Sequence, residues 1–148
     1  SAISSNKALM QRIENIRLEA GLRMGLGDVT QIVIPKVSIL AQARRGGTVF
    51  SYYLTPHHMH AAHAVTGAIC VASCTSIHNT VAETLTKRNQ DSSSTVQVEH
   101  PSGAIDVHLE ISGSDKNTQV QRAGIVRTAR KIMDGELFVP ANLWPPSS

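Results

Sequence analysis

The sequence has few aromatic residues and no long run of one charge. Phenylalanine, tyrosine and tryptophan make up 3% of its 148 residues, so its core must be built from Ile, Val, Leu, Ala and Met. The 14 Lys and Arg residues outnumber the 11 Asp and Glu residues, but they form no basic stripe interleaved with aromatics. We therefore predict no nucleic-acid partner. A mild positive balance fits small anionic substrates just as well.

Cysteine and long apolar segments are also scarce. Cys70 and Cys74 are the only cysteines, and a spacing of four on a helix is poor for a disulfide, so we expect buried free thiols. Free thiols suit a reducing compartment. No apolar run of transmembrane length is free of His or Ser, and no signal-peptide pattern opens the sequence. We expect a soluble, cytoplasmic protein without a membrane partner, the mitochondrion being the alternative location.

Several catalytic motifs are missing as well. The sequence contains no GxSxG, Walker loop, GxGxxG, CxxC pair or HExxH, so the common nucleophilic, nucleotide and zinc chemistries have no support. Its length suits one domain with a sizeable core and is too short for two full-sized domains. We predict a single domain over residues 1–148, in which residues 141–148 form a tail.

What is present is a pattern of one amphipathic helix followed by strands. Helical spacing covers residues 7–24, and its predicted buried face consists of Leu9, Ile13, Ile16 and Ala20. Strands are predicted over residues 31–43, interrupted at Pro35, and over residues 48–54, with a turn between them.

The second half of the chain predicts further strands around a polar loop. We expect an exposed loop over residues 86–95 and strands over 95–100 and 103–111. The side chains predicted to share one face of these strands are Val96, Val98, Ile105, Val107, Leu109 and Ile111. Residues 118–140 predict one or two more strands, marked by Val120, Ile125, Val126, Ile132, Met133, Leu137, Phe138 and Val139.

The most unusual stretch is PHHMHAAHAVTGAICVASCTSI, residues 56–77. It predicts an apolar helix of small residues at the centre of the domain. Its start carries four histidines, His57, His58, His60 and His63. Histidines three apart on a helix are neighbours and could share a metal, but the spacing matches no closed zinc pattern. A hydrogen-bonded, partly buried helix start is the interpretation that we favour, and we predict no metal.

Two further features of the pattern allow both a structural and a functional reading. Gly67 in mid-helix predicts close packing against another segment, or a helix start whose N–H groups bind an anion. The sequence His100-Pro101-Ser102-Gly103 predicts a tight turn that could expose two adjacent N–H groups to a carboxylate. A turn without function is the alternative. Pattern alone thus predicts an α+β domain with a polar helix start and an anion-friendly turn.

Taken together, the longer stretches resemble a known family. These are QRIENIRLEAGLRMGLGDV with IPKVSILA, MHAAHAVTGAICVA, EHPSGAIDVHLEI and VQRAGIVRTARKIMDGELFVP. In this order they resemble the C-terminal half of the PrpF family of methylaconitate and methylitaconate isomerases. The resemblance implies a diaminopimelate-epimerase-like fold, in which each domain is a mixed sheet wrapped around one long central helix. The active site would lie in the cleft between two such domains.

The resemblance also implies a chemistry. Family members move a double bond in small unsaturated di- and tricarboxylates such as aconitate, methylaconitate or methylitaconate, by an allylic proton shift without a cofactor. Ser102 and Gly103 would hold a substrate carboxylate, while His100 shapes the turn. The helix start would face the same cleft through Met59, His60, His63, Thr66 and Gly67.

The sequence departs from the related proteins in two respects. Ala64 stands where related epimerases carry a catalytic cysteine, so a two-cysteine mechanism is not expected. The family's proposed catalytic lysine belongs to an N-terminal half that this sequence does not contain, so we expect the chain to be inactive alone. We interpret it as part of a full isomerase, completed by that half or by a partner chain, and expect a homo-oligomer. A non-catalytic carboxylate-binding domain and a metal-binding domain are the alternatives.

Overall fold

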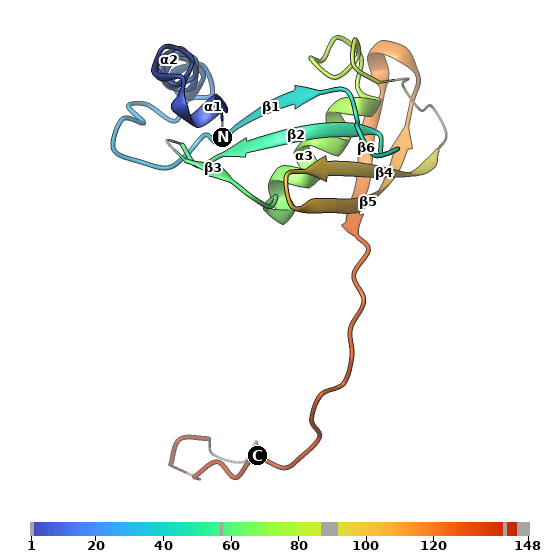
Figure 1. Ribbon diagram of the computed structural model, residues 1–148. Helices are drawn as coiled ribbons and strands as arrows, with labels where there is room; N and C mark the ends of the chain where they lie inside the picture. The colour runs from blue at the N-terminus through green and yellow to red at the C-terminus, as the bar shows by residue number, and fades with distance from the viewer. Residues whose placement is uncertain (1, 57, 87–91, 141, 145–148) are drawn as a thin grey trace.

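The fold is a sheet that curves over one buried helix (Figure 1). The computed structural model describes residues 2–56, 58–86, 92–140 and 142–144. The elements are α1 (Ala2–Ser5), α2 (Lys7–Arg23), β1 (Val37–Ala41), β2 (Val49–Leu54), β3 (Met59–His60), α3 (Val65–Ser76), β4 (Ser93–His100), β5 (Gly103–Ser112), η1 (Asp115–Asn117) and β6 (Gln119–Ile125). In Figure 1, α1 and α2 lie together at one end of the sheet, and the chain after β6 runs away from it.

The sheet is mixed, as predicted. Its strand order is β1-β2-β4-β5-β6, and the short β3 pairs with β2. The β2–β4 pair is parallel, with Val49 opposite Val98, and the other pairs are antiparallel. Parallel neighbours cannot be joined by a tight turn. The segment between β2 and β4 therefore has to cross the sheet, and α3 is this crossover.

The core between α3 and the sheet is aliphatic. Helix α3 contacts β2, β4, β5 and β6. The buried core side chains are Val49, Ala68, Val71, Ala72, Val96, Val98, Val107, Leu109 and Ile111. The predicted alternation along β4 and β5 is confirmed, because this set contains Val96, Val98, Val107, Leu109 and Ile111, and Ile105 packs against it. The predicted fold class, a mixed sheet around a central helix, is therefore correct.

The central helix begins at Val65, after the histidines that were predicted to lie at its start and close to the alternative start at Gly67. The chain instead turns back after β2, where Thr55 N donates to His58 O at 2.9 Å, with Pro56 at the turn position that its fixed φ favours. The next two residues form β3, opposite Tyr53 and Leu54 of β2. The described histidines, His58, His60 and His63, therefore lie in a hairpin and a loop, and not on a helix. His57 lies outside the described residues.

Helix α2 matches its predicted range, but its predicted face is only partly buried. Asn6 caps it by accepting a hydrogen bond from Leu9 N at 3.0 Å. The buried residues are Ile13, Arg17 and Gly21, whereas the predicted core residue Ile16 is 56% exposed. The reason is Arg17, whose guanidinium pairs with Glu14 and donates to three carbonyls of the segment that leads to β1, those of Val29, Ile32 and Ile34. A buried guanidinium that is satisfied in this way decides the orientation of the helix.

Of the one or two strands predicted over residues 118–140, one is formed, β6. Residues 126–140 adopt neither helix nor strand. Val126 N donates to Asp106 O at 3.1 Å, after which this segment, which we call the arm, leaves the sheet (Figure 1). Its apolar side chains are exposed, including Ile132 at 90% and Phe138 at 88%. An apolar pattern forms a strand only beside a neighbouring edge, and no described strand lies beside the arm.

The structure also bears on three smaller predictions, which concern the cysteines, the start of β4 and the polar loop and tail. Cys74 is half-buried, but Cys70 is exposed, because it lies on the side of α3 that borders a surface hollow. Strand β4 begins at Ser93, two residues before its predicted start. Residues 87–91 of the predicted loop, and residues 141 and 145–148 of the predicted tail, lie outside the described residues. Within the described parts, no helix has the length and apolar character needed to cross a membrane.

Candidate functional site

The turn between β4 and β5 is attached to the loop before α3. Ser102 N and Ser102 Oγ both donate to Ala61 O, at 3.0 and 2.8 Å. His100 Nδ1 lies 3.3 Å from the same oxygen and 3.2 Å from Ser102 Oγ. The expectation that Ser102 presents a free N–H group is therefore wrong, because the carbonyl of Ala61 already accepts that hydrogen.

These contacts fix the proton of His100. The carbonyl of Ala61 can only accept, and the Ser102 hydroxyl gives its hydrogen to that carbonyl, so the ring hydrogen of a neutral His100 must be on Nδ1. Its Nε2 then carries the lone pair. The ring is only 6% exposed, and it lies beside Gly103, where an added Cβ would be 3.5 Å from His100 Cε1.

His63 also holds this loop in place, through contacts with β2 and with the main chain of Ala64. Its Nε2 lies 2.9 Å from Ser51 Oγ of β2, and its Nδ1 lies 3.2 Å from Ala64 O. Its ring is tilted against that of Tyr53, with the centroids 4.5 Å apart. Burial is the main cause that lowers the pKa of His63, and the nearby His100 lowers it further. We conclude that His63 is a neutral, hydrogen-bonded ring, in line with the structural reading of the histidine cluster.

Met59 and His60 lie on β3 and do not share a helix face with His63. Met59 is half-buried opposite Leu54, and His60 is exposed, with its ring edge-on to Tyr53 at 6.3 Å. The predicted pairing of His60 with His63 as helical neighbours is therefore wrong. Among the described residues, no three His, Cys, Asp or Glu side chains come close enough to hold a metal ion.

The start of α3 supports the packing reading of its glycine. A Cβ added at Gly67 would lie 2.7 Å from Tyr53 Cε2 and 3.0 Å from His63 Cε1, so close packing is confirmed. The helix cap, Ala64, offers no side-chain hydrogen bond, and Thr66 is exposed. A hollow of about 370 Å³ borders this helix start, and it is lined by Met24, Ile34, Pro35, Lys36, Ser38, Tyr53, Thr66, Gly67 and Cys70.

The pattern reading missed two residues that support the turn, Glu99 and Arg45. The carboxylate of Glu99 accepts the main-chain N–H groups of Arg44, Arg45 and Gly47 at 2.7–2.8 Å. These hydrogen bonds, led by that of Arg44, lower the pKa of Glu99. The sequence contains one signal for the role of Glu99, because this acidic residue directly precedes the predicted turn.

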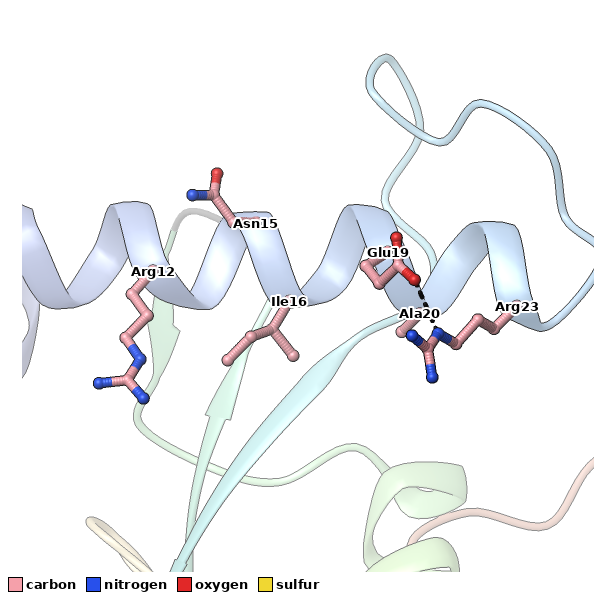
Figure 2. A pocket seen from close by; sticks show the side chains of 6 residues that line it. All are labelled: Arg12, Asn15, Ile16, Glu19, Ala20 and Arg23. Carbon is pink, nitrogen blue, oxygen red and sulfur yellow. Dashed lines mark hydrogen bonds and ion pairs between the residues drawn. The ribbon is translucent and has the colours of Figure 1, made fainter.

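A second hollow lies along an exposed face of α2 (Figure 2). It is lined only by that helix, through Arg12, Asn15, Ile16, Glu19, Ala20 and Arg23. Figure 2 shows Arg12, Ile16 and Ala20 on one side of the helix, with Glu19 paired to Arg23 at 2.7 Å. A single helix face of this kind has no convergent polar groups, so it is not the candidate active site.

Comparison with known proteins identifies the family. The PrpF protein family matches residues 1–140. The chain belongs to the PrpF family. YbhH of Escherichia coli (strain K12) is 44% identical over 138 residues, which cover 93% of this chain and 38% of YbhH. The 4-oxalomesaconate tautomerase of Pseudomonas putida is 37% identical over 142 residues, covering 96% of this chain and 38% of the tautomerase.

A solved structure confirms the fold of this PrpF-family chain. The crystal structure of methylitaconate-delta-isomerase superposes with a TM-score of 0.71 at 22% identity, covering 90% of this chain and 38% of that one. At this identity the likeness shows the fold alone. The resemblance derived from the sequence is thus confirmed, and the chain spans 38% of the length of these relatives.

Proposed function

We propose that this chain is the carboxylate-holding domain of an isomerase that moves a double bond in an unsaturated di- or tricarboxylate, such as aconitate, methylaconitate or methylitaconate. Such a shift needs a base near a carboxylate, donors for the dienolate charge, and a proton returned two carbons away. The substrate's own carboxylate delocalises the charge, so the proposal includes no cofactor. The family match over residues 1–140 supports the reaction class.

The observation that carries the proposal is the convergence of donors at the turn. Both Ser102 donors, N–H and O–H, already point to one oxygen atom, that of Ala61. A substrate carboxylate oxygen that displaces this carbonyl would receive the same two hydrogen bonds. His100 Nδ1–H lies beside them and can follow the same oxygen. Gly103 keeps the adjacent surface free of a side chain.

A second carboxylate of the substrate fits the hollow at the start of α3. The first N–H groups of a helix and the positive end of its dipole favour an anion. The side-chain hydroxyl of Thr66, the exposed Lys36 and the Cβ-free surface of Gly67 line this hollow. His60 and Met59 lie nearby on β3. Two carboxylate positions separated by this loop would select a substrate with at least two carboxylates.

The base comes from outside this chain in the proposal. The relatives are longer, since the chain covers 38% of each. Exposed apolar side chains on the arm and on the outer face of α2 support contact with the remainder of a longer protein or with a partner chain. We also propose a homo-oligomer, in which copies cover part of this apolar surface.

The test uses the full-length parent protein with trans-aconitate, methylaconitate and methylitaconate, followed by proton NMR. We expect the olefinic signals of at least one acid to convert to those of its double-bond isomer. Ser102→Ala should reduce kcat/KM about 10- to 100-fold, because it removes one donor to the developing charge, whereas Ser114→Ala, at an exposed loop residue, should not. No conversion of any of these acids by the wild-type parent would contradict the proposal. Binding without turnover would instead support the alternative of a carboxylate-binding domain.

A further inference from the structure

The loop between β1 and β2 wraps around a buried carboxylate. Glu99 is 1% exposed, and its two oxygens accept three main-chain N–H groups from residues 44–47. A Cβ at Gly47 would lie 2.8 Å from Glu99 Cγ, so the loop closes around this side chain without room for another. Glu99 immediately precedes the turn at residues 100–103, and it therefore ties the loop to the turn.

The side chain of Arg45, whose main chain is bound to Glu99, contacts the turn itself. One guanidinium nitrogen, Nη2, donates to His100 O and to Gly103 O, each at 2.7 Å. An Nη group carries two hydrogens, so each carbonyl receives one of them. These two carbonyls belong to the first and last residues of the turn. The guanidinium thus bridges the two ends of the turn.

We propose that Arg45 is a positioning residue for the anion-binding turn and that Glu99 holds Arg45 in place. This inference rests on the proposed function. Two carbonyl dipoles beside a bound carboxylate repel it, and a guanidinium that binds both removes that repulsion while fixing the turn. Arg45 would therefore raise the affinity for a polycarboxylate indirectly. It fixes the main chain of the turn and so the positions of Ser102 and Gly103.

The neighbouring arginine provides a matched control. Arg44 also gives its main-chain N–H to Glu99, at 2.8 Å. Its guanidinium, however, lies over the ring of Phe50 at 4.7 Å from the centroid and forms no hydrogen bond with residues 100–103, all of which the structure describes. Both single replacements remove one positive charge from the loop, but only the replacement of Arg45 removes hydrogen bonds to the turn. Comparing the two variants therefore separates these two effects.

The first measurement is amide hydrogen exchange in this chain. Arg45→Met should speed exchange at Ser102 and Gly103 about tenfold, because two charge-assisted hydrogen bonds are lost, and Arg44→Met should leave it within about twofold. Arg45→Lys should give an intermediate rate, because one ammonium can still bind a carbonyl. If Arg45→Met is too unstable to study, Arg45→Lys and Glu99→Gln replace it. Equal exchange in the Arg44 and Arg45 variants would overturn the proposal.

The second measurement concerns the anion. In the full-length parent, Arg45→Met should raise KM, and the dissociation constant of tricarballylate, about tenfold with a smaller change in kcat, because positioning affects binding first. Faster exchange at the turn with unchanged KM and tricarballylate affinity would overturn the positioning role. A wild-type parent that neither isomerises nor binds these acids would reject the proposed function. The exchange measurement then decides by itself whether Arg45 holds the turn.

Discussion

In most proteins apolar side chains are buried and polar side chains are exposed. The turn at residues 100–103 and the arm at residues 126–140 show the opposite arrangement. The turn region is polar, yet Glu99 and His100 are 1% and 6% exposed. The arm is rich in apolar side chains, yet Leu137 and Phe138 are 87% and 88% exposed. The polar groups can be buried because the loop at residues 44–47 and the loop at Ala61 supply hydrogen-bond partners. Burial in these two regions thus follows the available partners, and hydropathy alone does not predict it there.

The largest expected contrast comes from removing apolar volume in the core and in the arm. Leu109→Ala should lower the free energy of unfolding by about 2–5 kcal/mol, because Leu109 is fully buried against α3 and leaves a cavity. Phe138→Ala should change it by less than about 0.5 kcal/mol. Urea unfolding followed by circular dichroism measures both. A comparable loss in the two variants would mean that the arm packs on this domain.

A smaller difference in stability between the two regions is expected when one glycine in each region is replaced by alanine. Gly47→Ala places a Cβ 2.8 Å from Glu99 Cγ and 3.2 Å from Gln97 O. It should destabilise the chain by about 1–3 kcal/mol through overpacking. A Cβ at Gly135 in the arm meets nothing within 4 Å, so Gly135→Ala should be neutral. Thermal unfolding of the two variants provides the comparison, and a neutral Gly47→Ala would show that the loop can move away from Glu99.

The acid dependence of stability should come from the turn region and not from the arm. Hydrogen bonds from the loop hold the pKa of Glu99 below its ordinary value of 4.5. The ionised form therefore stabilises the fold above that value, and this contribution disappears as the pH falls from about 4.5 through the lower folded pKa. Urea midpoints should fall more steeply over this range for the wild type than for Glu99→Gln. Glu136→Gln in the arm should follow the wild type, and equal slopes in all three would contradict the prediction.

The smallest expected effect on stability is cleavage of the arm. Brief trypsin treatment should cut after Arg127, Arg130 and Lys131, all of which are exposed, before it cuts after the buried Arg17. The free energy of unfolding of the trimmed product should stay within about 0.5 kcal/mol of that of the intact chain, because the arm makes few contacts with the sheet. Mass spectrometry identifies the cuts. Early cleavage at Arg17 would show that α2 is less firmly attached than its hydrogen bonds indicate.

The sequence predicted those elements whose apolar spacing coincides with their burial. Strands β4 and β5, the turn between them, and the range of α2 followed from local pattern, since each is defined by neighbours along the chain. The turn and the loop before α3, which the sequence predicted as parts of one site, are in contact through Ala61, whereas His60 lies on β3 and does not share an element with His63. The start of α3 was misplaced because a short hairpin and a polar loop have no periodicity to set them apart from a helix start.

The sequence by itself determined the family, the aliphatic core and the residues of the turn, because composition, spacing and motif are properties of the chain. Only the tertiary structure decided the orientation of α2, the tautomer of His100, and the attachment of the turn through Glu99 and Arg45. These features depend on hydrogen bonds between groups up to 58 residues apart in sequence. Their formation requires the sheet to bring the two segments together, and no local pattern records such a contact.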